Sequence, residues 1–246
     1  MVRYVDSRRR EEQILSLIID SYIKESKPIS SGYLCKEYKL SYSPATVRNV
    51  MVALEKKGFL SHLYTSSGRV PTEEGFRYYV KLLGKEGLIE NYPVTLNLGK
   101  LIDYEIDEVL DYTLDALTRL SGYTSLIALA GRNEKLLYKG MRFILEQPEF
   151  EDIEALKHII YALEVNITGL QNLLLNCLQE DIQIFIGEEI GCEDIANCSL
   201  IVSGLRRRNV SLALALLGPM RMNYLRATSC LYSVKNQLHS VIDDLI

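Results

Sequence analysis

Apolar residues recur at helical spacing along several stretches of the chain, and the most informative stretch lies near residue 50. Apolar positions fall at 47, 50, 51 and 54, and Ser43-Pro44 is typical of a helix start because serine caps well and proline needs no N–H there. One stripe of this helix can be buried, while the other side suits a helix lying in a DNA major groove. The same pattern also fits an ordinary surface helix. The candidate DNA contacts are Ser43, Ala45, Thr46, Arg48, Asn49 and Val52.

Two more helices are predicted before this one, and a hairpin after it. Residues 8–25 carry apolar positions at helical spacing, and Ser30 can cap a short helix that runs to residue 38. Gly58 can end the third helix in the left-handed conformation. The β-rich residues 59–64 and the turn residues after them predict a hairpin of wing type. Together these elements predict a winged helix-turn-helix domain.

The predicted wing supplies a second set of candidate DNA contacts. A wing beside a recognition helix can touch the DNA backbone or the minor groove, and an arginine among small hydroxyl residues suits phosphate contact. Pro71 is expected to close the wing, and Thr72 to cap the next helix. The wing candidates are Thr65, Ser66, Ser67, Gly68 and Arg69.

The rest of the chain alternates helical and strand patterns. Residues 84–100 are loosely patterned around Gly and Pro, so we expect an interdomain connection there. A mixed sheet flanked by helices is the economical arrangement for the elements that follow. The pattern predicts helices over 101–120, 152–177 (loosened near Gly169) and 223–245, and strands over 124–130, 136–145, 182–186, 199–203 and 210–217.

Charge divides the chain into two unlike parts. The net charge of the whole is −4, yet residues 1–87 carry 15 Lys and Arg against 10 Asp and Glu, whereas residues 88–246 carry 13 against 22. A basic N-terminal domain followed by an acidic one fits a phosphate-contacting module joined to a sensor or assembly module. It also fits a basic domain that binds an acidic protein.

Several classes of function find no support in the sequence. The N-terminus leads directly into a charged segment, so no signal peptide is expected, and the longest apolar run, 212–220, is much shorter than the ~20 residues of a membrane span. The cysteines show no C-x-x-C spacing and the histidines no metal-ligand spacing, so we expect no disulfide framework, metal or cofactor. No nucleotide-binding or hydrolase motif is present. We therefore expect a cytoplasmic protein without a catalytic site.

Two local clusters have both a structural and a functional interpretation. The basic residues 206–208 are interpreted as a solvated turn between strands, with contact to DNA or a partner as the alternative. Residues 218–224 could bind an anion at a helix start, but a structural turn from strand to helix is favoured.

Three N-terminal segments carry a family resemblance: PATVRN at 44–49, LEKKGFL at 54–60 and TSSGRVPTEEGFRYYV at 65–80. They resemble the winged-helix domain of the HrcA family, the heat-inducible repressors of bacterial chaperone operons. The resemblance implies a homodimer that binds double-stranded DNA at an inverted repeat, with a GroEL-type chaperonin maintaining the active form. The chain departs from the family pattern at Val50, Tyr64 and Ser67, where the family usually has an acidic residue, a His and an Ala, so operator preference could differ.

The second half resembles the same family through shorter motifs, namely QPEF at 147–150, IGEE at 186–189, CSLI at 198–201 and GPMRMNY at 218–224. The family's second domain is GAF-like and carries an inserted dimerising subdomain. In this chain only a few residues separate the strand at 124–130 from the segment that leads to Pro148, and this gap is expected to be too short for that insertion and for the first strands of the sheet.

These observations predict an α+β protein with three parts. Residues 1–85 are expected to form the winged-helix domain, residues 86–100 a linker, and residues 101–246 a reduced GAF-like mixed α/β domain for regulation and dimerisation. The expected function is repression of heat-shock operons. One alternative is that the GAF-like domain senses a small-molecule effector. Another is a DNA-binding protein that lacks regulated assembly or needs a partner chain.

Overall fold

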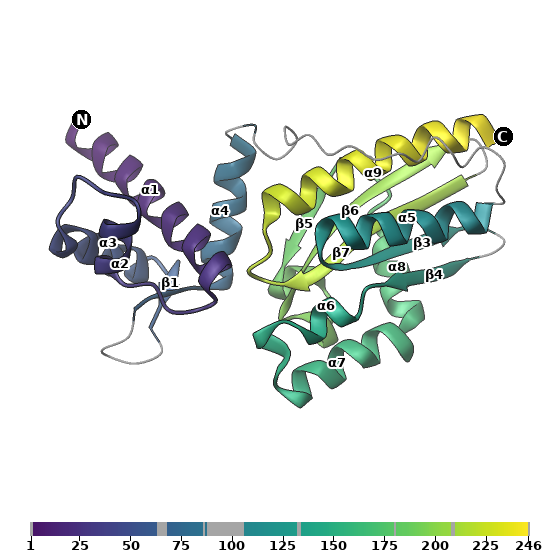
Figure 1. The fold of residues 1–246 in the computed structure, drawn as a ribbon, viewed down its shortest axis with the longest axis horizontal. Helices are drawn as coiled ribbons and strands as arrows, with labels where there is room; N and C mark the ends of the chain where they lie inside the picture. Colours follow the sequence, from purple (N-terminus) through teal and green to yellow (C-terminus); the bar gives the residue numbers. More distant parts are fainter. Residues whose placement is uncertain are drawn as a thin grey trace. The chain divides into compact units, whose positions relative to one another are not determined.

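A computed structural model gives the fold of the chain (Figure 1), which divides into two compact units, Met1–Glu86 and Gly87–Ile246. Each unit is described by itself. Of the predicted linker, all but Gly87 lies outside the described residues, and so do the predicted wing residues Thr65, Ser66 and Ser67. The structure describes residues 2–62, 68–85, 87, 106–131, 134–179, 181–207 and 210–245.

Unit 1 contains the three predicted helices followed by a short antiparallel ribbon and a fourth helix. Ser30 and Ser43 cap the second and third helices, because each side chain accepts a backbone N–H from the residue three positions later. Thr72 accepts the N–H of Gly75 in the same way at the start of the fourth helix. The elements are α1 (Val2–Glu25), α2 (Ser31–Glu37), α3 (Pro44–Lys56), β1 (Leu60–Ser61), β2 (Val70–Pro71) and α4 (Glu73–Lys85).

The core of unit 1 is built on α1. Its apolar stripe is fully buried, and α1 packs against α3, α4 and β2. Pro71 is the last residue of β2, and α4 begins two residues later. The buried apolar residues of α1 are Ile14, Leu15, Ile18 and Ile19.

Unit 2 consists of a five-stranded sheet with helices on both faces (Figure 1). The strand order is β4-β3-β7-β6-β5. Helices α5 and α9 pack together on one face, and α8 packs against β3 and β7 on the other. The elements are α5 (Ile106–Ser121), β3 (Thr124–Ala130), β4 (Lys135–Lys139), α6 (Arg142–Leu145), α7 (Ile153–Glu164), α8 (Ile167–Asn176), β5 (Gln183–Ile186), β6 (Cys198–Arg207), β7 (Val210–Pro219) and α9 (Tyr224–Leu245), with short 3-10 turns at Pro148–Phe150, Gly187–Ile190 and Glu193–Ile195.

The expectation of a mixed sheet is wrong, because every pair of neighbouring strands in this sheet is antiparallel. Parallel neighbours need a crossover connection of a dozen or more residues. The one long connection, from β4 through α6, α7 and α8, leads to β5 at the opposite edge of the sheet. β3 and β4 follow each other closely in the chain and form a hairpin, with Ile127 opposite Leu137.

Two predicted elements in unit 2 are each divided in the structure. The strand expected over 136–145 ends at Lys139, because Gly140 takes a φ of +91° and α6 follows. The helix expected over 152–177 breaks into α7 and α8. Val165 and Asn166 both donate their N–H groups to the carbonyl of Tyr161, at 2.9 and 2.8 Å, which ends α7. The break therefore precedes Gly169, which lies inside α8.

We expect Gly75→Ala to destabilise unit 1 by about 1–3 kcal/mol, because overpacking forces the backbone to move. A Cβ at Gly75 would lie 2.2 Å from the carbonyl oxygen of Phe59, the residue that joins α3 to β1. Gly32→Ala is the matched control, since a Cβ there meets no atom within 4 Å. Calorimetric unfolding of both variants tests this, and equal transition temperatures would contradict it.

Candidate nucleic-acid interface

The start of α3 is fixed by a side-chain cap. The Oγ of Ser43 accepts the N–H of Thr46 at 3.1 Å and lies 2.9 Å from the Oγ1 of Thr46. Pro44 occupies the first turn, where its missing N–H leaves no unpaired group. The Thr46 hydroxyl is therefore engaged with the cap, a constraint that the sequence pattern does not show.

The rest of α3 presents one buried and one exposed face. Val47, Met51 and Leu54 are at most 4% exposed. On the other side the apolar Val52 is 37% exposed, and neither Arg48 nor Asn49 has a hydrogen-bond or ion-pair partner within the part of the chain that the structure describes. The helix thus offers a guanidinium, an amide and an apolar group to solvent. The exposed face consists of Ala45, Arg48, Asn49, Val52 and Lys56.

Glu55 joins the far end of α3 to the β1–β2 ribbon. Its carboxylate accepts from the Nε and the terminal nitrogen of Arg69, each at 2.9 Å, and it pairs with the Nδ1 of His62. Burial alone would raise the pKa of Glu55, but the hydrogen bond from His62 and the charge of Arg69 outweigh it, so its pKa lies below the ordinary value. Sequence reasoning missed Glu55, because residues 14 positions apart in sequence gave no signal of an ion pair.

Arg69 lies on the ribbon, where it is held by its backbone as well as by its side chain. Its N–H and carbonyl exchange hydrogen bonds with Ile29, at 2.8 and 2.9 Å, so the segment before α2 pairs with the ribbon. Gly68 makes this approach possible, since a Cβ there would lie 2.5 Å from the carbonyl carbon of Ile29. The Arg69 side chain is only 20% exposed. Phosphate contact by Arg69 therefore stays a prediction, and the structure adds Glu55 as its partner.

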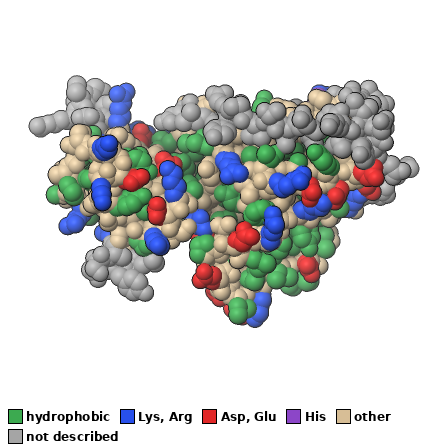
Figure 2. All heavy atoms as spheres, in the orientation of Figure 1, with side chains coloured by type: hydrophobic (Ala, Val, Ile, Leu, Met, Phe, Trp, Pro, Cys, Tyr) green, Lys and Arg blue, Asp and Glu red, His purple; other side chains and the backbone are tan. Residues whose placement is uncertain are grey.

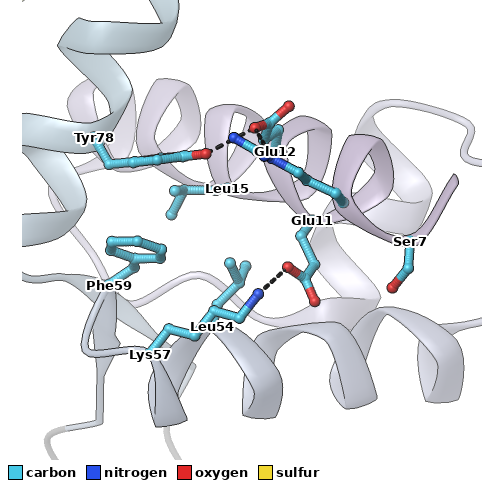
Figure 3. Close-up of a pocket in the computed structure, with 9 residues that line it drawn as sticks. Ser7, Glu11, Glu12, Leu15, Leu54, Lys57, Phe59 and Tyr78 are labelled. Carbon is cyan, nitrogen blue, oxygen red and sulfur yellow. Dashed lines mark hydrogen bonds and ion pairs between the residues drawn. The ribbon is translucent and has the colours of Figure 1, made fainter. Parts of the chain in front are cut away.

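Side chains from α1, α3 and α4 meet around a cavity of about 310 Å³ in unit 1 (Figure 3). Lys57 pairs with Glu11 across it, and the hydroxyl of Tyr78 donates to Glu12 at 2.7 Å. Tyr78 also stacks on Phe59, with ring centroids 4.8 Å apart. The charged groups of this cavity satisfy one another, so we interpret it as part of the packing that orients α3.

Several Lys and Arg side chains of unit 1 are exposed at its surface. Figure 2 shows Lys and Arg side chains spread over the visible face of this unit. Cations without an acidic partner among the described residues can attract phosphates, whereas paired cations do so less strongly. The exposed cations of this kind are Arg9, Lys27, Lys36, Lys39, Arg48, Lys56 and Lys81.

The motifs of the second half converge on a structural cluster. Arg221, only 10% exposed, pairs with Glu149 and donates to the Oε1 of Gln147 at 2.8 Å. The hydroxyl of Tyr123 accepts the N–H of Asn223 at 2.8 Å, and the buried hydroxyl of Tyr224 lies 2.8 Å from the Oγ of Ser199. These mutual contacts favour the structural interpretation of the turn at 218–224.

Two other sets of residues bear on the predicted chemistry. Arg206 and Arg207 end β6 instead of forming a turn, and Arg208 lies outside the described residues. His158 lies 3.2 Å from Asp194 and is exposed. Among the described residues, no group of three or more His, Cys, Asp or Glu could hold a metal ion, and none of the described helices is long and apolar enough to cross a membrane.

The family model and the relatives that match this chain belong to the same family. Residues 98–228 match the family model described as the HrcA protein C-terminal domain. The chain is 25% identical to the heat-inducible transcription repressor HrcA of Symbiobacterium thermophilum, with 93% of this chain and 97% of the relative covered. It is 50% identical over 80 residues to the HrcA repressor of Chlorobium chlorochromatii, covering 32% of this chain and 23% of the relative.

The fold as a whole also has a solved counterpart. The crystal structure of a hypothetical protein at 2.2 Å resolution superposes with a TM-score of 0.80 at 17% identity, covering 96% of this chain and 99% of the other. The alignment with the Symbiobacterium relative is 330 positions long, whereas this chain has 246 residues. The relative therefore contains segments that this chain lacks.

We expect Glu55→Gln to lower the free energy of unfolding by a few tenths of a kcal/mol near neutral pH, because partly exposed ion pairs contribute little. A carboxyl whose pKa is depressed in the fold stabilises it above the unfolded-state pKa, and this contribution is lost as pH falls through the folded pKa. The difference between variant and parent should therefore disappear in acid. Unfolding at about pH 7 and about pH 3 measures it.

Glu37→Gln is the matched control, since Glu37 is exposed at the end of α2 and belongs to no ion pair among the described residues. It should behave like the parent at both pH values. A Glu55→Gln effect that grows in acid would contradict the role assigned to Glu55.

Proposed function

Because this chain belongs to the HrcA family of heat-inducible transcription repressors, we propose that it represses heat-shock operons by binding an inverted-repeat operator as a dimer. Unit 1 is the DNA-binding part, a winged helix-turn-helix domain, and unit 2 is a GAF-like domain for regulation and dimerisation. The observation that carries the proposal is the exposed face of α3, where Arg48 and Asn49 have no partner among the described residues. A protein of this kind acts on the chromosome, in the cytoplasm.

In the proposed complex the N-terminal end of α3, which Ser43 caps, lies deepest in the major groove. Asn49 is placed to bond an adenine edge, and Arg48 to bond a guanine edge or a phosphate. Val52 supplies an apolar contact that suits a thymine methyl group. Ser43, Ala45 and Thr46 lie at the start of the helix, close to where the DNA backbone would pass. The Thr46 hydroxyl can still accept or donate while bonded to Ser43.

The wing is proposed to hold the register of α3 through the DNA backbone. Thr65, Ser66, Ser67, Gly68 and Arg69 form this segment, and the pair between Arg69 and Glu55 ties its base to α3. A phosphate near Arg69 would share the guanidinium with Glu55, so each contact would support the position of the other. Cations around α3 would add binding that does not depend on sequence.

Dimerisation is proposed because one small module makes few contacts at cellular salt. Two modules on two half-sites would combine their affinities, with unit 2 setting their separation. The strand order β4-β3-β7-β6-β5, with helices on both faces, supports a GAF-like unit. A GroEL-type chaperonin is proposed to maintain the active form, as the family resemblance implies. The absent segments would include the family's inserted dimerising subdomain.

The alternative of a small-molecule effector has one feature in its favour. A surface groove of about 630 Å³ in unit 2 is lined by Asn172, Asn176 and Asp194 among other residues. A ligand that binds only the folded state raises the unfolding temperature, and the rise grows with the logarithm of its concentration above the dissociation constant. A metabolite panel in a thermal-shift assay would therefore support this alternative through a reproducible, concentration-dependent rise.

Mapping of bound sites across the genome tests the proposed function directly. The expected result is a small set of inverted repeats upstream of chaperone genes. Binding spread over the chromosome without a shared sequence would contradict specific repression, and so would binding confined to unrelated genes.

We expect Arg48→Ala to weaken binding to the mapped operator by about 1–3 kcal/mol and to relax the sequence choice at one position. Arg69→Ala should weaken binding to operator and scrambled duplexes alike and flatten the salt dependence, since a phosphate contact carries no sequence information. Gel shifts at two salt concentrations measure both effects.

The matched control for these two variants is Lys81→Ala, which removes an exposed cation from α4, away from the α3 face. It should bind like the parent. Indistinguishable behaviour of Arg48→Ala and Arg69→Ala would overturn the division between base reading and backbone contact.

A further inference from the structure

Exposed apolar side chains in unit 2 concentrate around α7. Of the ten large hydrophobic residues that are exposed among the described residues, six lie between 145 and 167. Figure 2 shows hydrophobic side chains gathered over the lower part of unit 2, where Figure 1 places α7. Scattered exposed apolar residues are normal on a protein surface, but a contiguous group marks a contact surface. The six are Leu145, Ile153, Ile160, Tyr161, Val165 and Ile167.

The outer face of α7 carries a regular stripe. Ile153, Lys157, Ile160 and Glu164 follow one another at spacings of four, three and four residues, so they share one line along the helix. Ile153 is 66% exposed and the Lys157 side chain 64%. The opposite face is buried through Ile159, Ala162 and Leu163. The stripe therefore points away from the core of unit 2.

Two copies of this stripe bring opposite charges together only when the two helices run antiparallel. The midpoint between Lys157 and Glu164 coincides with the midpoint between Ile160 and Tyr161. When two copies of α7 pack antiparallel about that point, Lys157 of each faces Glu164 of the other, and the two Ile160 side chains lie next to each other at the centre. Parallel packing would instead place Lys157 beside Lys157 and Glu164 beside Glu164, which repel.

We propose that a second copy of this chain docks on the outer face of α7, through an antiparallel α7–α7 contact with reciprocal Lys157–Glu164 ion pairs. This contact would be the surface that joins two copies of the proposed repressor. Its biological role rests on the proposed function. The geometry of α7 carries it independently.

The charged groups on the stripe are free enough to serve such a contact. Lys157 donates to Glu154 at 2.6 Å, but both side chains are more than 60% exposed, and an exposed pair of this kind is weak and easily shared. Glu164 accepts from the hydroxyl of Tyr138 at 3.3 Å through one of its two oxygens. The other oxygen can accept from a partner copy.

The expected dimer is weak. One pair of crossed helices buries less than the ~800 Å² per partner of a standard interface. We therefore expect a dissociation constant on the order of micromolar, with DNA tightening the dimer by holding two copies at high effective concentration.

A charge-swap series tests the contact by sedimentation of the full chain over a range of concentrations. Lys157→Glu and Glu164→Lys should each raise the dimer dissociation constant about tenfold, because each places like charges face to face. The double variant K157E/E164K should restore the parent value, since the swapped pairs match again. Neither a misfolded protein nor a partner of different sequence would give this rescue.

Ile160→Asp provides a second, independent variant, and it should raise the dissociation constant by about a hundredfold or more, as expected at the centre of an interface. Tyr232→Asp is its matched control, since Tyr232 is also exposed, at 38%, but lies on α9 across the sheet. It should leave the association unchanged. A parent chain that stays monomeric throughout, or a double variant without rescue, would overturn the proposal.

Binding of a short random-sequence duplex at low salt, measured on the same variants, separates this inference from the proposed function. It depends on the basic surface of unit 1 and should not respond to changes on α7. A parent chain that dimerises through α7 but binds no duplex would sustain the contact and contradict the repressor function. Loss of duplex binding in Lys157→Glu with the dimer intact would contradict the independence of the two surfaces.

Discussion

The burial of Val47, Met51 and Leu54 is the constraint on which the rest of unit 1 depends. A helix of 13 residues is marginal in water by itself, so α3 persists because one face is packed. Burying that face against α1 determines which residues remain outside. Arg48, Asn49 and Val52 are exposed because they lie opposite the buried stripe. Their side chains are therefore available to contact a partner.

The ends of α3 are fixed by different means. At the N-terminus Ser43 satisfies a backbone donor, which sets where the helix begins. At the other end Glu55 pairs with Arg69 and His62, which joins the helix to the ribbon. In the proposed complex this carboxylate would reduce the charge that Arg69 offers to a phosphate. The side chain of Arg48 has no such internal competitor among the described residues.

Local sequence signals predicted those parts of the fold that local interactions decide. The caps at Ser30 and Ser43, the strand over 124–130 and the three N-terminal helices all follow from side chains within a few positions of one another. The pairing of Arg69 with Glu55 and the strand order depend on contacts between distant segments. The division of 152–177 is an intermediate case, because periodicity alone continues through Asn166 while the backbone turns there to bring α8 onto the sheet. A mixed sheet was predicted because the order of the elements alone does not show to which edge of the sheet each connection leads.

This chain lacks segments that its HrcA relatives contain, and this limits which surfaces of unit 2 could join two copies. The relatives extend over alignment positions that this chain does not fill, so any surface that brings two copies together has to come from the elements that remain. The outer face of α7 offers apolar area that no neighbouring element of unit 2 covers in the described residues. In the proposed complex a weak contact would suffice there, because an inverted repeat would hold two copies close and multiply a modest affinity. Repression would then respond steeply to the concentration of folded chains, since association through α7 needs a folded unit 2.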